Sequence, residues 1–416
     1  MYREINRCRI CGNQNIIDIL DLGNQSLTGI FQSNNVDKID KSPLVLSQCS
    51  KHSSSVCNPC GLVQLKHTYS LEAMYGDTYG YRSSLNKSMV DHLNKKVDNI
   101  SDFVELNIDD LVLDIGSNDG TLLSFYDKSL TRVGIDPTSE KYAEFYDPEI
   151  VRSSEFFSAD NFKRIVGNRK AKVITSISMF YDLEEPLKFV SEISECLHED
   201  GIWECEQSYL LSMLETNSYD TICHEHLEYY TIEVLDYMCQ LTGLEIIFIE
   251  FNDINGGSFS AKIAHKKSKF VPHPIVAIAL QKEKLYFSKP NIVMKNFSDL
   301  VFQSKEKILD YFNENYSSGR ITAGLGASTK GNVLLQFCEI STKQLPMIFE
   351  VNSDKYGKYT PGSNIPIYPE SELINHSIDD LFVLPWHFKS FFLKVKRLRK
   401  YNLVFPLPVL HKVKKS

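Results

Sequence analysis

The sequence has no long apolar run, no excess of basic residues and no apolar segment at its N-terminus. No stretch of the 416 residues approaches the roughly 20 consecutive apolar residues of a membrane-spanning helix, so we expect no membrane partner. The formal net charge of −8 and the isoelectric point near 5.8 argue against nucleic acid as the main partner. The first residues, MYREIN, lack the apolar core of a signal peptide, so we expect a cytoplasmic protein.

The composition is that of an ordinary globular protein, with 43% hydrophobic and 24% charged residues. A chain of this length predicts two or three domains. Ten cysteines are present, and in a cytoplasmic protein they favour metal ligands or reduced thiols over disulfides.

Two C-x-x-C-G motifs lie near the N-terminus, Cys8-Arg-Ile-Cys11-Gly12 and Cys57-Asn-Pro-Cys60-Gly61. Each motif turns the backbone so that two thiolates point at one ion, and four thiolates are a tetrahedral set for zinc. We therefore predict a structural Zn²⁺ site made of Cys8, Cys11, Cys57 and Cys60. Cys49 and His52 lie near the second motif, so an exchange of one ligand stays open.

The central segment LVLDIGSNDGTLL, residues 111–123, indicates a buried strand, a glycine turn and the start of a helix. Gly116 and Gly120 permit a positive φ and a close approach of the backbone to a ligand. A second strand, residues 132–136, ends in Asp136, where a carboxylate can accept hydrogen bonds from two ribose hydroxyls. The segment is therefore typical of a site for an adenosine-containing ligand.

Acidic residues surround this turn, and no basic cradle for phosphates accompanies it. Asp114, Asp119 and Asp136 would repel a pyrophosphate and attract the sulfonium and ammonium of S-adenosylmethionine. The pattern D-x-G-x-x-x-G thus favours a class I methyltransferase, the alternative being an ordinary strand–turn–helix of another doubly wound domain. Because ligands bind beyond the carboxyl ends of parallel strands, the predicted cofactor contacts are Asp114, Gly116, Asn118, Asp119, Gly120, Asp136, Phe157 and Ser178.

Two further segments carry polar and titratable side chains. In Cys223-His224-Glu225-His226 a histidine can serve as a base near neutral pH, and the glutamate can orient it. A His-x-His metal site and a buried structural pair of histidines are the alternatives.

The tyrosine-rich stretch 75–84 suits the wall of a polar ligand site, or a loop packed on the zinc lobe.

The last third of the chain repeats the strand–helix alternation. Residues 321–332 predict a strand, a glycine-rich turn and a helix start with Lys330 in the turn, which suits phosphate oxygens. The alternative is a tight strand–helix turn without a ligand. The fold class is therefore α/β, with a zinc-binding domain (1–72), a class I methyltransferase Rossmann-like domain (73–285) and a C-terminal Rossmann-like domain (286–416). A second nucleotide-binding fold suggests a substrate that itself carries a nucleotide, and the resemblance described next implies that the C-terminal domain binds a nucleotide sugar.

Together these motifs resemble the S-adenosylmethionine-dependent C-methyltransferases that act on nucleotide-linked keto-deoxysugars. The resemblance covers almost the whole chain. It rests on the two C-x-x-C motifs, on residues 79–84, on Cys223–His226 with Tyr229 and Tyr230, and on Gly326–Asn332. One departure is Cys223, because family members often have a tyrosine there, and this leaves open which proton is handled at that position.

The resemblance implies a mechanism and a set of site residues. His226 would remove a proton next to the ketone, assisted by Glu225 and by Tyr79 or Tyr81, and Tyr79 or His224 would hold the enolate oxygen. The acceptor would be a sugar linked to dTDP, GDP or CDP in the biosynthesis of a branched-chain sugar. The implied substrate contacts are Tyr81, Ser83, Ser84, Glu206, Tyr230, Ser328, Lys330, Asn332, Lys358 and Tyr359.

Two other functions stay open at this point. One is an O- or N-methyltransferase acting on a nucleotide sugar, and the other is a non-catalytic nucleotide-sugar-binding protein. The sequence does not identify the sugar, its nucleotide or the methylated carbon. We expect a monomer, because three lobes can close one cleft without a partner.

Overall fold

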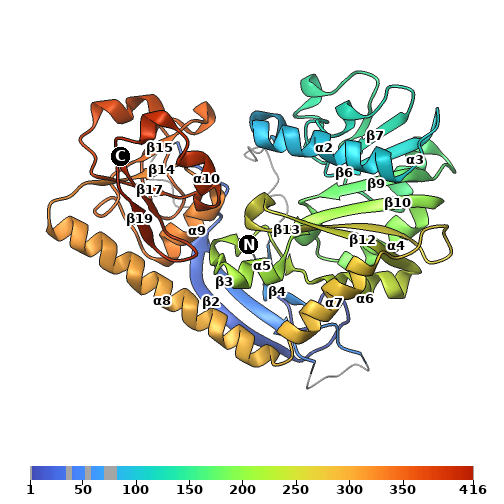
Figure 1. Cartoon of the computed structure of the whole chain (residues 1–416), viewed down its shortest axis with the longest axis horizontal. Coiled ribbons are helices and arrows are strands. Elements are labelled where there is room, and N and C mark those ends of the chain that lie inside the picture. The colour runs from blue at the N-terminus through green and yellow to red at the C-terminus, as the bar shows by residue number, and fades with distance from the viewer. Residues whose placement is uncertain (1, 34–39, 52–57, 70–81, 416) are drawn as a thin grey trace.

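The computed structural model describes residues 2–33, 40–51, 58–69 and 82–415, which form an α/β protein (Figure 1). Three sheets are seen in Figure 1: one on the right, one on the left, and a smaller one built from N-terminal strands between and below them. The predicted α/β class with two Rossmann-like sheets is confirmed. Within the described residues, none of the helices has the length and apolar character needed to span a membrane.

The sheet on the right has seven strands in the order β12-β13-β10-β9-β6-β7-β8, and β13 alone runs against its neighbours. The order fits the Rossmann-like core that the sequence predicts, and β12 and β13 form an antiparallel pair at one edge. The strands are β6 (Leu111–Ile115), β7 (Thr131–Ile135), β8 (Val151–Ser153), β9 (Ala171–Ile177), β10 (Leu197–Ser208), β12 (Leu244–Asn252) and β13 (Ser258–His265).

Helices cover both faces of this sheet, which explains the continuous apolar run of β6. Leu111, Leu113 and Ile115 pack in the core formed with α4 and α6, whereas Val112 packs in the core that contains Leu93 of α2. Successive side chains of a strand point to opposite faces, so a strand covered on both sides needs apolar residues throughout. The helices are α2 (Lys87–Phe103), α3 (Ala159–Val166), α4 (Pro186–Cys196), α5 (Leu210–Glu215), α6 (Ile232–Thr242) and α7 (Pro274–Tyr286).

The N-terminal strands form a four-stranded sheet in the order β11-β4-β3-β2, beside a two-stranded pair of β1 and β5. One of its strands, β11, comes from residues 228–229, directly after the His-Glu-His segment, and Leu65 N donates to Leu227 O at 2.8 Å. The zinc-binding lobe therefore contacts this segment through backbone hydrogen bonds. The strands are β1 (Tyr2–Glu4), β2 (Ile16–Ser26), β3 (Lys41–Cys49), β4 (Val63–Leu65), β5 (His67–Tyr69) and β11 (Glu228–Tyr229).

The sheet on the left has six strands in the order β16-β15-β14-β17-β18-β19, parallel except for β19. The long helix α8 runs beside this sheet and along β2 (Figure 1). The elements are α8 (Pro290–Ser317), β14 (Thr322–Leu325), α9 (Thr329–Phe337), β15 (Ile348–Glu350), β16 (Ile367–Pro369), β17 (Asp380–Val383), α10 (Lys389–Phe392), β18 (Asn402–Phe405) and β19 (His411–Val413).

The N-terminal lobe and the C-terminal unit share one hydrophobic core. Leu20 and Leu44 of the N-terminal sheet are buried in the same cluster as Phe297 and Val301 of α8 and Phe349 of β15. Burial of this apolar surface fixes the two parts against each other. The predicted boundaries at residues 72 and 285 stay a prediction, and the structure adds that contacts cross both of them.

Candidate functional site

The predicted cofactor loop lies at the carboxyl end of β6. Gly116 and Gly120 both have φ of +75°, and Asn118 has φ of +50°. Asp136, one residue beyond the end of β7, accepts a hydrogen bond from Asn118 N at 2.9 Å and two from Thr138, from N and from Oγ1, at 2.6 Å each. The acid and the glycine loop are therefore adjacent, as the spacing in the sequence predicts.

Neighbouring side chains leave no room for larger residues at the two glycines. A Cβ on Gly120 would lie 2.7 Å from the Tyr146 ring, and a Cβ on Gly116 would lie 2.9 Å from Cγ of Met179. Tyr146 also donates its hydroxyl hydrogen to Asn118 O at 2.9 Å. Tyr146 and Met179 therefore pack against the glycine loop, while Gly116 and Asn118 line the cleft. This arrangement fits the adenosine part of S-adenosylmethionine.

The other predicted cofactor residues divide into two groups. Asp114, Phe157 and Ser178 line the cleft together with Gly116, Asn118 and Asp136, whereas Asp119 and Gly120 do not. Asp119 is buried and accepts a hydrogen bond from Ser84 N at 3.0 Å, so its carboxylate holds the backbone at Ser84 against the glycine loop. Burial raises the pKa of Asp114 to about 7, while a hydrogen bond from Thr175 Oγ1 at 2.5 Å works in the opposite direction.

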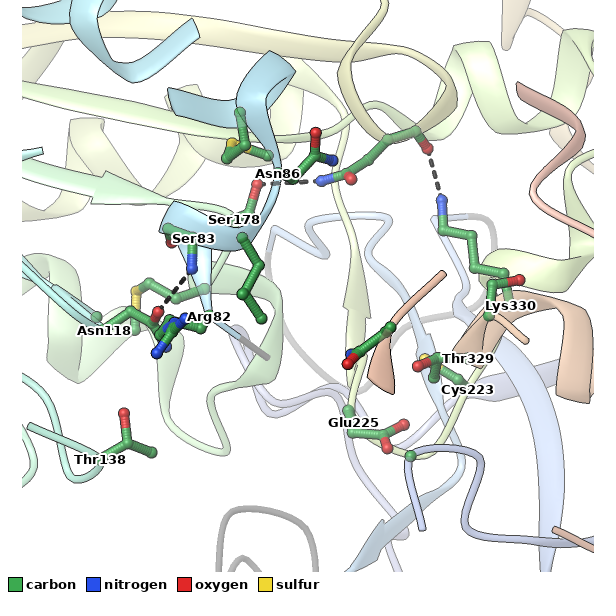
Figure 2. Close-up of a pocket in the computed structure, with 18 of the residues that line it drawn as sticks. Arg82, Ser83, Asn86, Asn118, Thr138, Ser178, Cys223, Glu225, Thr329 and Lys330 are labelled. Carbon is green, nitrogen blue, oxygen red and sulfur yellow. Dashed lines mark hydrogen bonds between the residues drawn. The ribbon is translucent and has the colours of Figure 1, made fainter. Parts of the chain in front are cut away.

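One cleft of 1340 Å³ joins all three parts of the chain. Figure 2 shows Asn118, Thr138 and Ser178 on one side of the open space and Glu225, Thr329 and Lys330 on the other. The N-terminal lobe contributes residues 27, 29–31 and 33, and the C-terminal unit contributes the turn 325–330. The cleft is therefore large enough for a cofactor and a second ligand together.

His226 faces this cleft with a defined tautomer. Its Nδ1 lies 3.0 Å from Thr221 O, which can only accept, so Nδ1 carries the hydrogen and Nε2 keeps its lone pair. The ring lies against Tyr181, with 4.3 Å between centroids. Burial, and then the charge of Lys330, lower the pKa of His226 to about 3. The imidazole is therefore neutral and able to accept a proton.

Glu225 also lines the cleft, whereas His224 does not. Glu225 accepts a hydrogen bond from Thr28 Oγ1 at 3.4 Å, and burial raises the pKa of this carboxyl. His224 is fully buried, its Nε2 lies 3.3 Å from Ser42 O, and its ring meets Tyr69 edge-on. This placement is at odds with the predicted catalytic role of His224, because its side chain points into the N-terminal lobe.

Cys223, the residue that departs from the family pattern, also lines the cleft. Burial raises the pKa of its thiol well above the ordinary value, so the sulfur stays protonated. Of the predicted tyrosine partners, Tyr79 and Tyr81 lie outside the described residues. Their roles stay a prediction.

Four of the predicted substrate contacts line the cleft, namely Ser83, Ser328, Lys330 and Lys358. The structure places five others away from it. Glu206 is buried beneath α2 and contacts His92 at 2.6 Å and Lys96 at 2.9 Å. The remaining four are Ser84, Tyr230, Asn332 and Tyr359.

Each of these four residues has a structural role instead. The Tyr230 ring is buried and stacks on Phe180 at 4.9 Å. Asn332 donates from Nδ2 to Thr28 O at 2.8 Å and so ties α9 to the N-terminal lobe. Tyr359 forms a backbone bridge with Gln32, and Ser84 N is held by Asp119.

Sequence reasoning missed several residues of the C-terminal side of the cleft. Glu350, at the end of β15, accepts a hydrogen bond from Ala327 N at 2.7 Å, in the way that Asp136 accepts one from Asn118 N. The signal was available, because an acid ending the second strand after a glycine turn is the pattern that identified Asp136. Other missed lining residues are Arg82, Tyr181, Asp182, Asn255, Lys355, Phe388, Phe391 and Arg397.

Four cysteines lie together in the N-terminal lobe: Cys8, Cys11, Cys49 and Cys60. Their sulfur atoms are within 4.8 Å of one another, with 3.4 Å between Cys8 and Cys60 and 3.6 Å between Cys11 and Cys49. Four thiolates at these separations fit tetrahedral Zn²⁺. Cys57, one of the four predicted ligands, lies outside the described residues, and Cys49 is the exchange that the sequence left open.

Arg9 connects the first cysteine motif to β11. Its Nη1 donates to Leu65 O at 2.6 Å and its Nη2 to His67 O at 3.0 Å, and its Nε lies 3.5 Å from Oε1 of Glu228. Burial raises the pKa of Glu228 well above its ordinary value, and the charge of Arg9 works against this rise. The side chains of Arg9 and Glu228 are 4% and 0% exposed, so neither can turn to water when the other is lost. The pair therefore fixes the segment that carries His226 against the zinc lobe.

Replacing Arg9 with methionine should lower the free energy of unfolding by about 3–5 kcal/mol, because Glu228 and two carbonyls lose their buried partner. Chemical denaturation measures this change. The matched control is Arg3→Met, since Arg3 pairs with Glu184 at 2.8 Å while 67% exposed. That variant should change stability by less than about 1 kcal/mol. Equal effects of the two substitutions would contradict the role of Arg9.

Three family models match successive parts of the chain. They describe a zinc binding domain (residues 8–75), a methyltransferase domain (90–248) and a C-methyltransferase C-terminal domain (253–408). A curated relative, the C-methyltransferase NovU from Streptomyces niveus, is 26% identical over 93% of this chain and 91% of its own length.

Two of the solved structures that the chain resembles each match less than half of it. An O-methyltransferase family protein from Burkholderia thailandensis is 17% identical, with a TM-score of 0.34 over 47% of this chain and 62% of its own. The plantazolicin methyltransferase BpumL, in complex with a desmethylPZN analogue and SAH, is 13% identical, with a TM-score of 0.33 over 42% of this chain and 84% of its own.

Proposed function

The chain belongs to the S-adenosylmethionine-dependent methyltransferases that join a zinc-binding domain, a methyltransferase domain and a C-methyltransferase C-terminal domain, and on this premise we propose that it methylates a carbon of a nucleotide-linked keto-deoxysugar. The observation that carries the proposal is the shared cleft. A neutral histidine, the cofactor loop and the C-terminal glycine turn all line it.

His226 is the proposed base. A carbon next to a ketone becomes nucleophilic only when its proton is removed, and Nε2 of His226 has the free lone pair for this step. Thr221 O holds the ring, so the proton is taken at a fixed position. Glu225 lies beside it in the cleft, where its carboxyl can bind a sugar hydroxyl.

The cofactor side of the cleft supplies the electrophile. S-adenosylmethionine, when bound, offers a methyl group on a sulfonium. Asp136 would hold the ribose hydroxyls, and Asp114 and Asn118 line the same edge. The acceptor's nucleotide would lie on the C-terminal side, near Ser328 and Lys358.

Hydrogen exchange tests the proposal. The probes are 4-keto-6-deoxyhexoses linked to dTDP, GDP and CDP, each incubated with the protein in deuterated water without S-adenosylmethionine. We expect one probe to gain deuterium at the carbon next to its ketone, and to gain a methyl group on that carbon once the cofactor is added. Transfer to oxygen or nitrogen without exchange would contradict the proposal, because only C-methylation requires a carbanion.

A further inference from the structure

Lys330 is the second residue of α9, yet its side chain reaches the methyltransferase part of the chain. Its Nζ donates to Asn255 O at 2.6 Å, and Asn255 Nδ2 donates to Ser178 Oγ at 3.2 Å (Figure 2). Ser178 lies at the carboxyl end of β9, on the cofactor side of the cleft. The side chain of Lys330 is therefore linked through Asn255 to the cofactor side of the cleft, although Lys330 itself belongs to the C-terminal unit.

Lys330 and the proposed base, His226, line the same cleft. Asp220, in the turn Tyr219–Thr221 that also anchors His226, is buried and accepts a hydrogen bond from Trp386 Nε1 at 2.8 Å. Its other oxygen, Oδ1, is buried with no hydrogen-bond partner among the described residues. Burial lowers the pKa of Lys330, while the charges of Asp220 and Cys223 raise it.

The charge of Lys330 acts on the histidines around it. It contributes, after burial, to the low pKa of His226 and of His387. Burial is the larger cause of both low pKa values, and the positive charge of Lys330 adds to it. The same cation is then available to an oxyanion that forms beside the base.

The proposed reaction creates such an oxyanion. When a proton leaves the carbon for Nε2 of His226, the electron pair moves onto the carbonyl oxygen, and a preorganised donor must receive it. The sequence suggested His224 or Tyr79 for this purpose. His224 lies outside the cleft, and Tyr79 lies outside the described residues.

We propose that Lys330 is a catalytic residue whose ammonium binds the enolate oxygen, a role that rests on the function proposed above. Nζ of Lys330 donates a hydrogen bond to the substrate oxygen in place of Asn255 O. The electron pair of the carbanion then forms the bond to the methyl group as the bond from methyl to sulfur breaks. His226 returns its proton to water.

Exchange kinetics of Lys330→Met test this role against phosphate binding. A group that stabilises the enolate affects kcat, whereas a phosphate ligand affects mainly KM. We expect deuterium exchange into the active keto-sugar probe to slow about 100-fold or more in kcat. Affinity for S-adenosylmethionine, measured by calorimetry, should stay within about twofold and shows that the variant is folded.

Because the cation lowers the pKa of His226, the acid limb of the exchange rate should also move to higher pH.

Two further variants define the result. Lys343→Met removes an exposed cation of the same domain outside the cleft and should leave the exchange rate unchanged. Lys330→Arg keeps the charge and should recover part of the rate lost in Lys330→Met. A wild-type kcat in Lys330→Met, or a rise in KM alone, would overturn the role of Lys330 and leave the proposed function intact. Absence of exchange in the wild-type protein would overturn the proposed function and this role with it.

Discussion

Replacing His226 with asparagine is expected to reduce methyl transfer by about 100- to 10,000-fold, the range usual for the loss of a general base. Asparagine is the sharper choice than alanine, because its Nδ2 can replace Nδ1 of the ring and still donate to Thr221 O. The segment should then keep its conformation while the lone pair of Nε2 is gone. Turnover is measured with labelled S-adenosylmethionine and the probe that undergoes exchange.

Two controls make this result specific. Cofactor affinity of His226→Asn should be unchanged by calorimetry, since Asn118 and Ser178 lie across the open space from Glu225, the residue before His226 (Figure 2). His224→Gln should keep turnover within a few-fold and lower the melting temperature, because His224 is buried against Ser42 in the N-terminal lobe. If His224→Gln abolished turnover while folding normally, the assignment of the base would be wrong.

The pH dependence provides an independent check on His226. Burial, and then Lys330, hold the pKa of His226 at about 3, below its ordinary value, so the neutral form predominates throughout the range from about pH 5 to 8. Protonation of this base therefore produces no loss of rate near pH 6.5. In the unfolded chain His226 has its ordinary pKa of about 6.5, so between about pH 3 and pH 6.5 the unfolded chain binds more protons at this position than the folded protein does. The free energy of unfolding therefore falls as the pH decreases through this range.

Replacing Asp136 with alanine is the second substitution with a large expected effect, and it acts on the cofactor. The carboxylate can accept hydrogen bonds from two ribose hydroxyls, each worth about 1.5–3 kcal/mol for a charged acceptor, so affinity should fall by about 100-fold or more. The substitution also removes the acceptor for Asn118 N and Thr138, which releases the glycine loop. Calorimetry with S-adenosylmethionine measures the loss.

The matched control for Asp136 is Asp299→Ala, which removes an exposed carboxylate on α8 that does not line the cleft. Its cofactor affinity should equal that of the wild-type protein. A wild-type dissociation constant for Asp136→Ala would contradict the assignment of the cofactor site. Loss of binding in both variants would instead indicate a general effect of the changed net charge.

The glycine loop and the acid that follows it were predictable because their signals are local. An apolar run, two glycines and an acid about twenty residues later specify a strand, a turn and a second strand whose ends lie together. Asp136, Gly116 and Asn118 accordingly line the cleft as the sequence predicts. The same pattern occurs at β14 and β15, where Glu350 is the acid that ends the second strand.

The direction of individual side chains was not predictable in the same way. Glu206 is an acid near the carboxyl end of β10, but its side chain points to the face that α2 covers, where Lys96 and His92 pair with it. The alternation of side chains along a strand predicts which residues share a face of the sheet. It does not predict which helix covers that face. His224 and His226 are likewise equivalent in the sequence, and the pairing of β11 with β4 decides which of them faces the cleft.

By itself, the sequence determined the α/β class, the methyltransferase core with its cofactor loop, and a zinc-binding lobe rich in cysteine. Each of these depends on residues close together in the chain, whose spacing sets the local backbone. Only the tertiary structure decided that Cys49 lies with Cys8, Cys11 and Cys60, and that Lys330 reaches across to Asn255. These contacts join residues far apart in the sequence, and they exist because burial of a shared hydrophobic core holds the N-terminal and C-terminal parts against each other around one cleft.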